Sequence, residues 1–518
     1  MRFTVMVAVL LAAASAVDAD SLYLGKVDTV GGTTYDWQTG GPALRRCCYS
    51  QGSGVYVVWL SSQLDDPYPD RNVKYNFWDE ASRDWAFIEP DFMGSGAGIF
   101  SFRAGFGNLD VAPGSGEAWV SAHTGWPLRP VVANLTAGGV LEGPEGYKWP
   151  VIACGQGDHV HLVMMDEATS DGLWYTRAPL DTVTEMGRPG YVSYNLAASK
   201  VSEKVAAFWS DRESETSQVF FRVSTDAGLS WGEVAGLEPP PAYGQDTIPV
   251  FSLWGSFPFF DGQDRMHLVT SLVPRVRDTT WVLPAEIWHW CPENTPPWSR
   301  IHRAETQHLM GSVGYNAMYL DRPSIGEDFL GRLYVTWEQF DSMNVEPGTN
   351  VLRAGIWLAG STDNGRAWNP ALRITPENTV SHRFPCVVDR PFPDSVCITY
   401  MMDSMAGFYV QGQGRISRNP IVCQWVPSAS AGIDERKPAG NVAKSTGPTV
   451  VKGDRHLQLP VSARRSRAVV VDAVGRRVTG MEPGSSEMPG LAPGVYFVVP
   501  ESGTDRKADR VSRIVVVK

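Results

Sequence analysis

Several arginines stand at points where the sequence predicts that a β-strand begins. Arg188 and Arg322 each directly precede a proline, and Arg383 lies two residues before one. A guanidinium group can hold a carboxylate through two parallel hydrogen bonds, which fixes both the charge and the orientation of the bound group. These arginines would form one anion-binding centre if the fold brought the strand starts together. Otherwise each would pair with a local carboxylate, as Arg322 would with the neighbouring Asp321.

The elements that must position these arginines recur along the chain. A short alternating strand of one type appears seven times, and long helical patterns are missing. Steps of 42 to 67 residues separate the repeats, and a four-stranded sheet with its turns needs roughly 40–50. We therefore predict an all-β chain with a seven-bladed β-propeller, or a six-bladed one if a repeat is spurious. A pair of β-sandwiches is the alternative. The central residues of the repeated strand are Val57, Val120, Leu162, Ala207, Leu268, Val335 and Ile398.

Two copies of one turn motif favour the propeller. The motif S-T-D-x-G-x-x-W occurs at 224–231 and 361–368, each time after a predicted third strand. The Asp can cap backbone N–H groups, the Gly allows a positive φ, and the Trp can pack under the blade. The motif resembles the Asp-box, or BNR, repeat of the sialidase-like β-propellers, and 78–85 resembles a decayed third copy. In that family the Asp-box lies opposite the substrate, which implies a structural role for Ser224, Asp226, Gly228, Trp231, Ser361, Asp363, Gly365 and Trp368.

The same resemblance implies an arginine cluster around a substrate carboxylate. Sialidases use three arginines, the first within a Phe/Tyr-Arg-Ile-Pro sequence. Here the corresponding place keeps the arginine, Arg46, but lacks the aromatic residue, Ile and Pro. Because the inner strands of a propeller start around one mouth, the resemblance implies substrate-binding roles for Arg46, Arg188, Arg322 and Arg383.

Sialidase chemistry further needs a Tyr nucleophile, a carboxylate that activates it and a separate acid. By position alone, the resemblance assigns the acid to Asp66, the activating carboxylate to Glu213 and the nucleophile to Tyr400. No local motif ties these three residues together. Other carboxylates that fit by position are Asp65, Asp70, Glu215 and Glu338.

Composition separates an acidic body from a basic tail. The 518 residues carry a net charge of −11, but residues 432–518 hold 15 Lys and Arg against 9 Asp and Glu. All 19 Trp and all seven Cys precede residue 426. An acidic body argues against nucleic-acid binding. The odd number of cysteines leaves at least one thiol unpaired within the chain. No two cysteines have CxxC spacing, so the sequence predicts no metal site and no cofactor.

Both ends of the chain predict export. Residues 1–19 have the short positive start, apolar stretch and small-residue cleavage site of a signal peptide, and no later segment is long and apolar enough to span a membrane. After a linker at 429–449, residues 450–518 predict a small Ig-like β-sandwich. Their D-x-x-G-R-x-V, L-x-P-G-V-Y-F and terminal V-V-V-K pieces resemble the C-terminal sorting domain of the bacterial type IX secretion pathway. The alternative interpretation of this segment is an Ig-like module of the flagellar-hook-cap type.

Together these features predict a secreted or surface-attached bacterial protein whose propeller spans residues 20–428. Its expected partners are an extracellular glycan or glycoprotein and, through the tail, the secretion machinery. The incomplete arginine signature leaves open whether the propeller is a glycoside hydrolase of sialidase-like type or a non-catalytic binding or adhesion module. A protein-binding scaffold is a third possibility without a specific residue signal.

Overall fold

The computed structural model describes residues 22–432, apart from 41–42, 212–217, 245 and 390–393, and five strand segments between 449 and 517. Two compact units divide the chain at residues 435 and 436. No helix in these described segments is long and apolar enough to cross a membrane. The predicted signal peptide (1–19) falls outside the described residues, as do residues 433–448 of the predicted linker (429–449).

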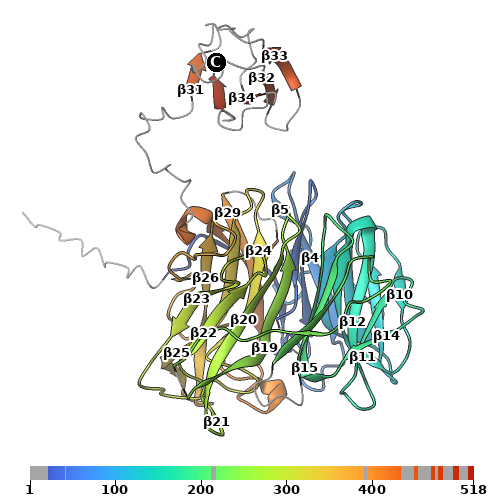
Figure 1. Cartoon of the computed structure of the whole chain (residues 1–518), viewed down its shortest axis with the longest axis vertical. Helices are drawn as coiled ribbons and strands as arrows, with labels where there is room; N and C mark the ends of the chain where they lie inside the picture. Colours follow the sequence, from blue (N-terminus) through green and yellow to red (C-terminus); the bar gives the residue numbers. More distant parts are fainter. Residues whose placement is uncertain are drawn as a thin grey trace, which may run out of the picture. The chain divides into compact units, whose positions relative to one another are not determined.

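The first unit is a seven-bladed β-propeller, in which seven sheets each follow an antiparallel path of four strands (Figure 1). The innermost strands are β2 (Cys47–Ser50), β7 (Ala104–Val111), β11 (Tyr147–Gly155), β15 (Pro189–Ala198), β19 (Ile248–Phe260), β24 (Leu320–Glu327) and β28 (Ser381–Val387). The second strands are β3 (Gly54–Ser61), β8 (Ala118–Thr124), β12 (His159–Asp166), β16 (Val205–Asp211), β20 (Met266–Val276), β25 (Leu333–Glu346) and β29 (Ser395–Asp403).

The outer half of each blade completes the ring. The third strands are β4 (Asn72–Asp79), β9 (Arg129–Asn134), β13 (Leu173–Arg177), β17 (Val219–Ser224), β22 (Ala285–Trp290), β26 (Val351–Ser361) and β30 (Asn419–Pro427). The outermost strands are β5 (Asp84–Trp85), β10 (Val140–Glu142), β14 (Thr184–Gly187), β18 (Ala235–Gly236), β23 (Trp298–Ala304), β27 (Leu372–Arg373) and β1 (Lys26–Thr33). Two further two-residue strands, β6 (Ala97–Gly98) and β21 (Thr279–Thr280), extend the first and fifth sheets.

The N-terminal strand closes the ring. β1 pairs antiparallel with β30 from Lys26 opposite Trp425 to Thr33 opposite Asn419, so the last blade takes its outermost strand from the start of the chain. This pairing covers an edge that would otherwise present unpaired backbone groups. The remaining three strands of that blade come from residues 381–427.

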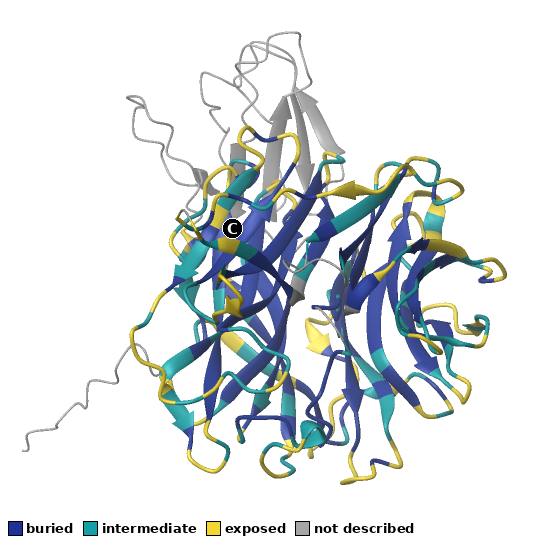
Figure 2. Cartoon of the chain, turned by 60° about the horizontal axis from the view of Figure 1, so that its bottom comes forward, coloured by how far each residue is buried: buried dark blue, intermediate teal, exposed yellow. Residues whose placement is uncertain are grey.

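The all-β prediction and the count of seven blades are confirmed. Each of the seven residues that marked the repeated strand lies in the second strand of a different blade. Second strands are buried on both faces because they lie between neighbouring blades. In β3 all eight residues are buried, for example. Figure 2 shows this burial along the strands and exposure at the turns.

The strand path gives the propeller two distinct faces. Consecutive antiparallel strands alternate in direction, so the connections between blades and the turns from second to third strands share one face, the mouth face. The turns from first to second and from third to fourth strands share the other, the base face. The motif turns at 224–231 and 361–368 follow third strands and therefore lie on the base face.

The second unit contains one five-stranded sheet in the order β31-β35-β34-β32-β33. Its strands are β31 (Thr449–Lys452), β32 (Ala468–Asp472), β33 (Arg477–Met481), β34 (Gly494–Pro500) and β35 (Ser512–Val517). β31 pairs with β35 in parallel, and the other pairs are antiparallel. The described residues supply a single sheet, so the predicted two-sheet sandwich stays a prediction.

Candidate functional site at the mouth face

A recurring β-bulge shapes the inner strands at the mouth. The register between first and second strands shifts after Gly105, Lys148, Asp321 and Arg383. Each bulge holds a non-glycine residue at positive φ, a conformation that such residues rarely adopt. The strain therefore recurs where the strands surround the propeller axis. These residues are Phe106 (φ 53°), Trp149 (φ 52°), Arg322 (φ 50°) and Phe384 (φ 58°).

Three of the four predicted arginines converge around the bulge residue Phe384. The guanidinium carbon of Arg322 lies 4.9 Å from the centre of the Phe384 ring, that of Arg383 5.7 Å and that of Arg46 6.0 Å. All three side chains are buried. Arg46 also donates to the Phe384 carbonyl. The starts of three different strands thus form one compact basic cluster.

Glu338 of β25 supplies the counter-charge of this cluster. Its carboxylate accepts a 2.6 Å bond from Arg322 and bonds of 3.1 and 3.0 Å from Nε and Nη2 of Arg383. Burial opposes ionisation of Glu338, but the two guanidinium groups outweigh it and hold its pKa at about 2. Burial raises the pKa of the adjacent Asp321 to about 6. Glu338 is thus the ionised partner, and Asp321 lies 3.6 Å from Arg322.

The segment between β1 and β2 fills the axis beneath the mouth. Ala43 packs in the core between the fifth and sixth blades, and Leu44 packs against the third and fourth blades. Arg45 lies over the rings of Phe257 and Phe259 in β19. The axis is therefore closed by protein, and a ligand at the mouth would rest on this plug.

Two buried carboxyls flank the arginine cluster. Asp36 accepts bonds from the backbone N–H groups of Tyr409 (2.5 Å) and Val410 (3.3 Å), and Asp403 accepts one of 2.8 Å from Met405. Burial raises the pKa of Asp36 to about 6 and that of Asp403 to about 7, against the attraction of Arg383. Both groups therefore change charge near neutral pH.

Next to Asp36, the loop before β4 and the end of β8 bring together polar atoms that have no hydrogen-bond partner among the described residues. They are the Tyr68 hydroxyl, Nε of Arg71 and Nδ1 of His123, each buried and without a hydrogen bond in the described part of the chain. Arg71 lies 5.2 Å from the centre of the Tyr35 ring. Burial, Arg71 and Lys148 lower the pKa of His123 to about 3, so its ring is neutral. Buried polar groups usually have partners, so these three atoms retain unused hydrogen-bonding capacity within the described residues.

Two arginines of this region, Arg71 and Arg103, lie close enough to repel each other. Burial and the repulsion of Arg71 lower the pKa of Arg103, which is exposed at the mouth. Among the described residues neither guanidinium forms an ion pair: Arg71 donates to the Tyr35 hydroxyl (3.3 Å) and Arg103 to the Pro67 carbonyl (3.5 Å). Neighbouring like charges that lack a counter-ion favour binding of an anion.

An exposed aromatic side chain lies on the same face of the propeller as these arginines. Trp126 is 87% exposed, in the turn between β8 and β9. The same turn is tied to Arg103, because the Thr124 hydroxyl donates a 2.7 Å bond to the Arg103 carbonyl. An indole face left in water is a surface on which a sugar ring can stack. We call Tyr68, Arg71, Arg103, His123 and Trp126 the mouth cluster.

The remaining predicted site residues do not join the arginines. Arg188 is exposed ahead of β15. Tyr400 is buried in the core beside Tyr334, and its hydroxyl donates a 2.8 Å bond to Gln424. Asp66 is exposed at the mouth in the same loop as Tyr68. Glu213 lies outside the described residues, so the proposed catalytic set remains a prediction.

The two motif turns share one hydrogen-bond pattern. Ser224 donates to Asp226 (2.7 Å) and accepts from the Gly228 N–H (2.8 Å), while Asp226 accepts from the Ser230 N–H (2.9 Å). The second turn repeats these bonds at 2.9, 3.0 and 3.0 Å between the equivalent residues. The two tryptophans then pack against rings of the preceding blades, Trp231 on Tyr175 and Trp368 on His289.

A cavity of about 480 Å³ opens on the base face between Tyr49 and Phe329. Lys200 and Asp389 line it, and both charges are matched. Lys200 lies 2.8 Å from Asp110, and Asp389 lies 2.9 Å from Arg45. The cavity therefore offers no unbalanced charge to a ligand, unlike the mouth cluster. The described residues contain no group of three or more side chains arranged to hold a metal ion.

The fold defines the chain as a seven-bladed β-propeller, and similar solved structures carry the names of glycan-active enzymes. One is an ulvan lyase of polysaccharide lyase family PL25 (10% identity, 77% of this chain and 96% of that chain, TM-score 0.45). Another is an α-L-arabinanase of Penicillium chrysogenum (12%, 78% and 98%, TM-score 0.37). A third is the NanB sialidase of Streptococcus pneumoniae (9%, 77% and 70%, TM-score 0.37). No protein-family model and no curated protein matches the chain. This likeness assigns neither a family nor a site.

Proposed function

We propose that this chain is an exported bacterial, sialidase-like propeller protein that recognises acidic glycans at its mouth face. The observation that carries the proposal is the mouth cluster. Within the described residues it combines buried polar atoms without hydrogen-bond partners, two neighbouring arginines that form no ion pair, and an exposed indole. A sugar that bears a carboxylate or sulfate supplies the matching hydroxyls, charge and apolar face.

The buried arginine cluster supports the mouth from below. Arg322 and Arg383 are committed to Glu338, so we assign them to holding the inner strands around Phe384. Arg46 keeps one terminal nitrogen without a partner in the described structure. The acidic group of the glycan would meet Arg71 and Arg103 first, and the buried cluster would add a positive field beneath them.

Export and sorting complete the proposal. The N-terminal segment would direct secretion, and the C-terminal unit would address the protein to the type IX pathway for release or surface attachment. The repeated bond pattern at 224–231 and 361–368 supports the assignment of both turns as Asp-boxes with a structural role. Their place on the base face agrees with a ligand site on the mouth face.

A glycan-binding assay with the full chain tests this function. The ligands are oligosaccharides that bear uronate, sialate or sulfate, each matched to a neutral analogue. Wild type is expected to retain the acidic set. Arg103→Ala should weaken binding about tenfold, the loss expected for one charged hydrogen bond. Trp126→Ala should weaken it several-fold. Both side chains are exposed, so neither change removes core packing.

Matched variants on the base face provide the control. Arg366 and Leu229 are exposed in the two motif turns, and replacing either with Ala should leave binding unchanged. Equal retention of neutral and acidic sugars would contradict the proposal. So would a loss in Arg366→Ala as large as that in Arg103→Ala.

Hydrolysis is a second candidate function, favoured by the buried carboxyls beside Arg383. An acid with a pKa of about 6 or 7, as for Asp36 and Asp403, can donate a proton near neutral pH. A panel of fluorogenic glycosides, sialosides included, tests this candidate. Turnover that is lost in Asp36→Asn or Asp403→Asn, with folding intact, would establish an enzyme. Silence of the folded chain across the panel would leave the binding function alone.

A further inference from the structure

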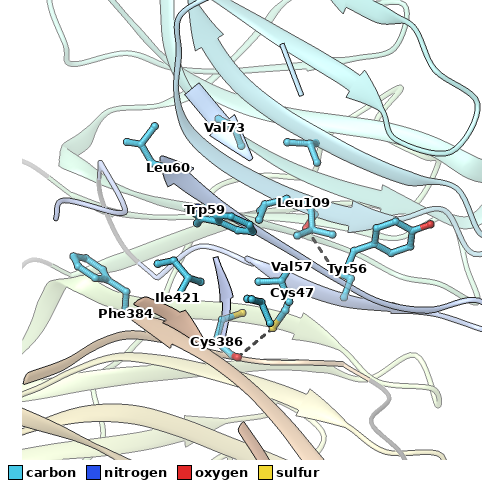
Figure 3. Close-up of a cluster of buried hydrophobic side chains, with 14 of the residues drawn as sticks. Cys47, Tyr56, Val57, Trp59, Leu60, Val73, Leu109, Phe384, Cys386 and Ile421 are labelled. Carbon is cyan, nitrogen blue, oxygen red and sulfur yellow. Dashed lines mark hydrogen bonds between the residues drawn. The ribbon is translucent and has the colours of Figure 1, made fainter. Parts of the chain in front are cut away.

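Two thiols face each other across the junction of the first and last blades. Cys47 lies in β2 and Cys386 in β28, the innermost strands of these blades, and both are fully buried. The Cys47 thiol donates to the Cys386 carbonyl over 3.2 Å. Figure 3 shows the two side chains together within the core that also holds Val57 and Ile421.

The pair is also matched chemically. Burial, together with the neighbouring Cys386 thiol, raises the pKa of Cys47. Burial opposes ionisation of Cys386, but the Cys47 thiol and Arg46 outweigh it and lower its pKa to about 6. The Arg46 backbone N–H donates to the Cys386 sulfur over 3.3 Å. In the folded chain Cys386 is therefore the more acidic thiol of the pair.

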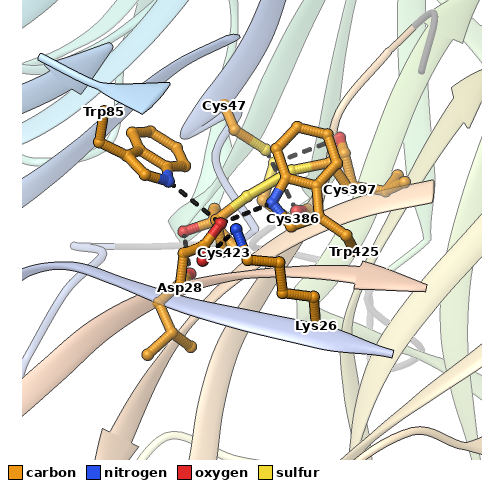
Figure 4. Close-up of a disulfide and its surroundings, with 11 residues drawn as sticks. Lys26, Asp28, Cys47, Trp85, Cys386, Cys397, Cys423 and Trp425 are labelled. Carbon is orange, nitrogen blue, oxygen red and sulfur yellow. Dashed lines mark hydrogen bonds and ion pairs between the residues drawn. A yellow bond between two sulfur atoms is a disulfide. The ribbon is translucent and has the colours of Figure 1, made fainter. Parts of the chain in front are cut away.

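The other cysteines do not compete for this pairing. Cys397 and Cys423 already form a disulfide within the last blade, close to the thiol pair (Figure 4). Cys48 points towards the second blade, where its sulfur lies 3.6 Å from the Leu109 carbonyl. Cys154 packs in a separate core, and Cys291 lies beside Glu293.

We propose that Cys47 and Cys386 form a second disulfide that locks the inner edge of the ring closure. Strand β1 already closes the outer edge through its pairing with β30. β2 is only four residues long, so the first blade has little backbone pairing of its own near the axis. A covalent bond between β2 and β28 would join residues 339 positions apart and hold the two blades together at this point.

The reaction needs a disulfide oxidant, as supplied by a thiol oxidoreductase of an oxidising compartment. The Cys386 thiolate attacks one sulfur of the oxidant's disulfide and forms a mixed disulfide, releasing the first thiolate of the oxidant. Cys47 then loses its proton and attacks the Cys386 sulfur, which releases the second. Counted from the two thiols, the protein loses two protons and two electrons, and the oxidant's disulfide is reduced to a dithiol. Because both sulfurs are buried in the finished fold, we expect the bond to form while the chain folds.

Thiol counting tests the proposal. The full chain would be exported to a bacterial periplasm behind a host signal sequence and purified without reductant. It would then be unfolded in the presence of N-ethylmaleimide, which labels free thiols, and its mass would be measured by mass spectrometry. Without the proposed bond, the chain has five free cysteines and one disulfide. We expect the number of adducts to fall by two, and a cross-linked peptide to contain Cys47 and Cys386.

Two serine variants distinguish this bond from any other. Cys48→Ser should keep the cross-link, whereas Cys47→Ser should lose it and melt at a lower temperature than wild type under non-reducing conditions. Five adducts in the wild type would overturn the proposal. A cross-link from Cys386 to Cys397 or Cys423 would overturn it as well. None of these results depends on glycan binding, so the two proposals can fail separately.

Discussion

Glu338 is the residue on which the buried arginines depend. It is fully buried and accepts hydrogen bonds from both Arg322 and Arg383, so its removal would leave two guanidinium groups without their shared counter-charge. We expect Glu338→Gln to lower the free energy of unfolding by roughly 3–5 kcal/mol, the cost of breaking a buried ion pair. Chemical denaturation of wild type and variant would measure this loss in the free energy of unfolding.

The control for that variant is an ion pair of the same kind at the surface. Glu305 pairs with Arg303 and its side chain is 61% exposed. Glu305→Gln should change the free energy of unfolding by at most about 1 kcal/mol. Similar effects of the two variants would contradict the role given to Glu338.

Asp403 gives stability a pH dependence of opposite sign to that of an ordinary ion pair. Its pKa is about 7 in the fold against 3.8 for a free aspartate side chain, so ionisation destabilises the folded state. Stability from this group therefore rises as pH falls from about 8 through 7 and levels off below 4. Wild type should melt higher at pH 6 than at pH 8, and Asp403→Asn should reduce that difference. An unchanged difference would contradict the burial of an ionisable group here.

At the residue scale the sequence predicted only part of the site. Arg322 and Arg383 could be found because they mark strand starts, and strand starts meet at the mouth. Glu338 was a candidate by position, but its partners were not visible because they lie 16 and 45 residues away. Tyr68, Arg71 and His123 were missed, since their meeting depends on loop paths that no local pattern encodes.

Among the elements, the motif turns test how tightly neighbouring blades are packed. Gly365 lies at φ 73°, and a Cβ built there would lie 2.3 Å from the His289 ring of the preceding blade. Gly365→Ala should therefore add a steric clash to the backbone strain of a positive φ. We expect a loss of roughly 2–4 kcal/mol in the free energy of unfolding, measured by thermal or chemical denaturation.

Gly52 provides a control that has the same φ as Gly365 but no atom close to the position of an added Cβ. It also lies at φ 73°, but a Cβ built there would have nothing within 4 Å. Gly52→Ala should cost only the strain, roughly 1 kcal/mol. Equal losses in the two variants would show that the turn at 361–368 does not press on the fifth blade.

The repeated strand was the element that the sequence encoded best. Alternation of large apolar residues identified the second strand of every blade, because that strand packs on both faces. The outermost strands were not recognisable, since β5, β18 and β27 are two residues long. The bulges of the inner strands also escaped notice, although a proline inside several of them is a visible sign.

For the whole molecule, ring closure by the N-terminal strand is the decisive feature. Removal of residues 1–33 would delete β1 and expose the β30 edge, so we expect a lower melting temperature and aggregation of the truncated protein. Removal of 436–518 is the matched control, because these residues form a separate compact unit. Calorimetry of both truncations checks the prediction. A loss of stability confined to the second truncation would contradict it.

The central claim is that an acidic glycan binds over the first two blades at the mouth. Hydrogen exchange of the full chain, with and without the tightest-binding acidic oligosaccharide, tests it most directly. The account predicts slower exchange in residues 62–71 and 118–129, which hold the mouth cluster apart from Arg103, and no change at 224–231 or 361–368. Protection confined to the two motif turns, or around the base-face cavity, would place the ligand on the opposite face and contradict the account.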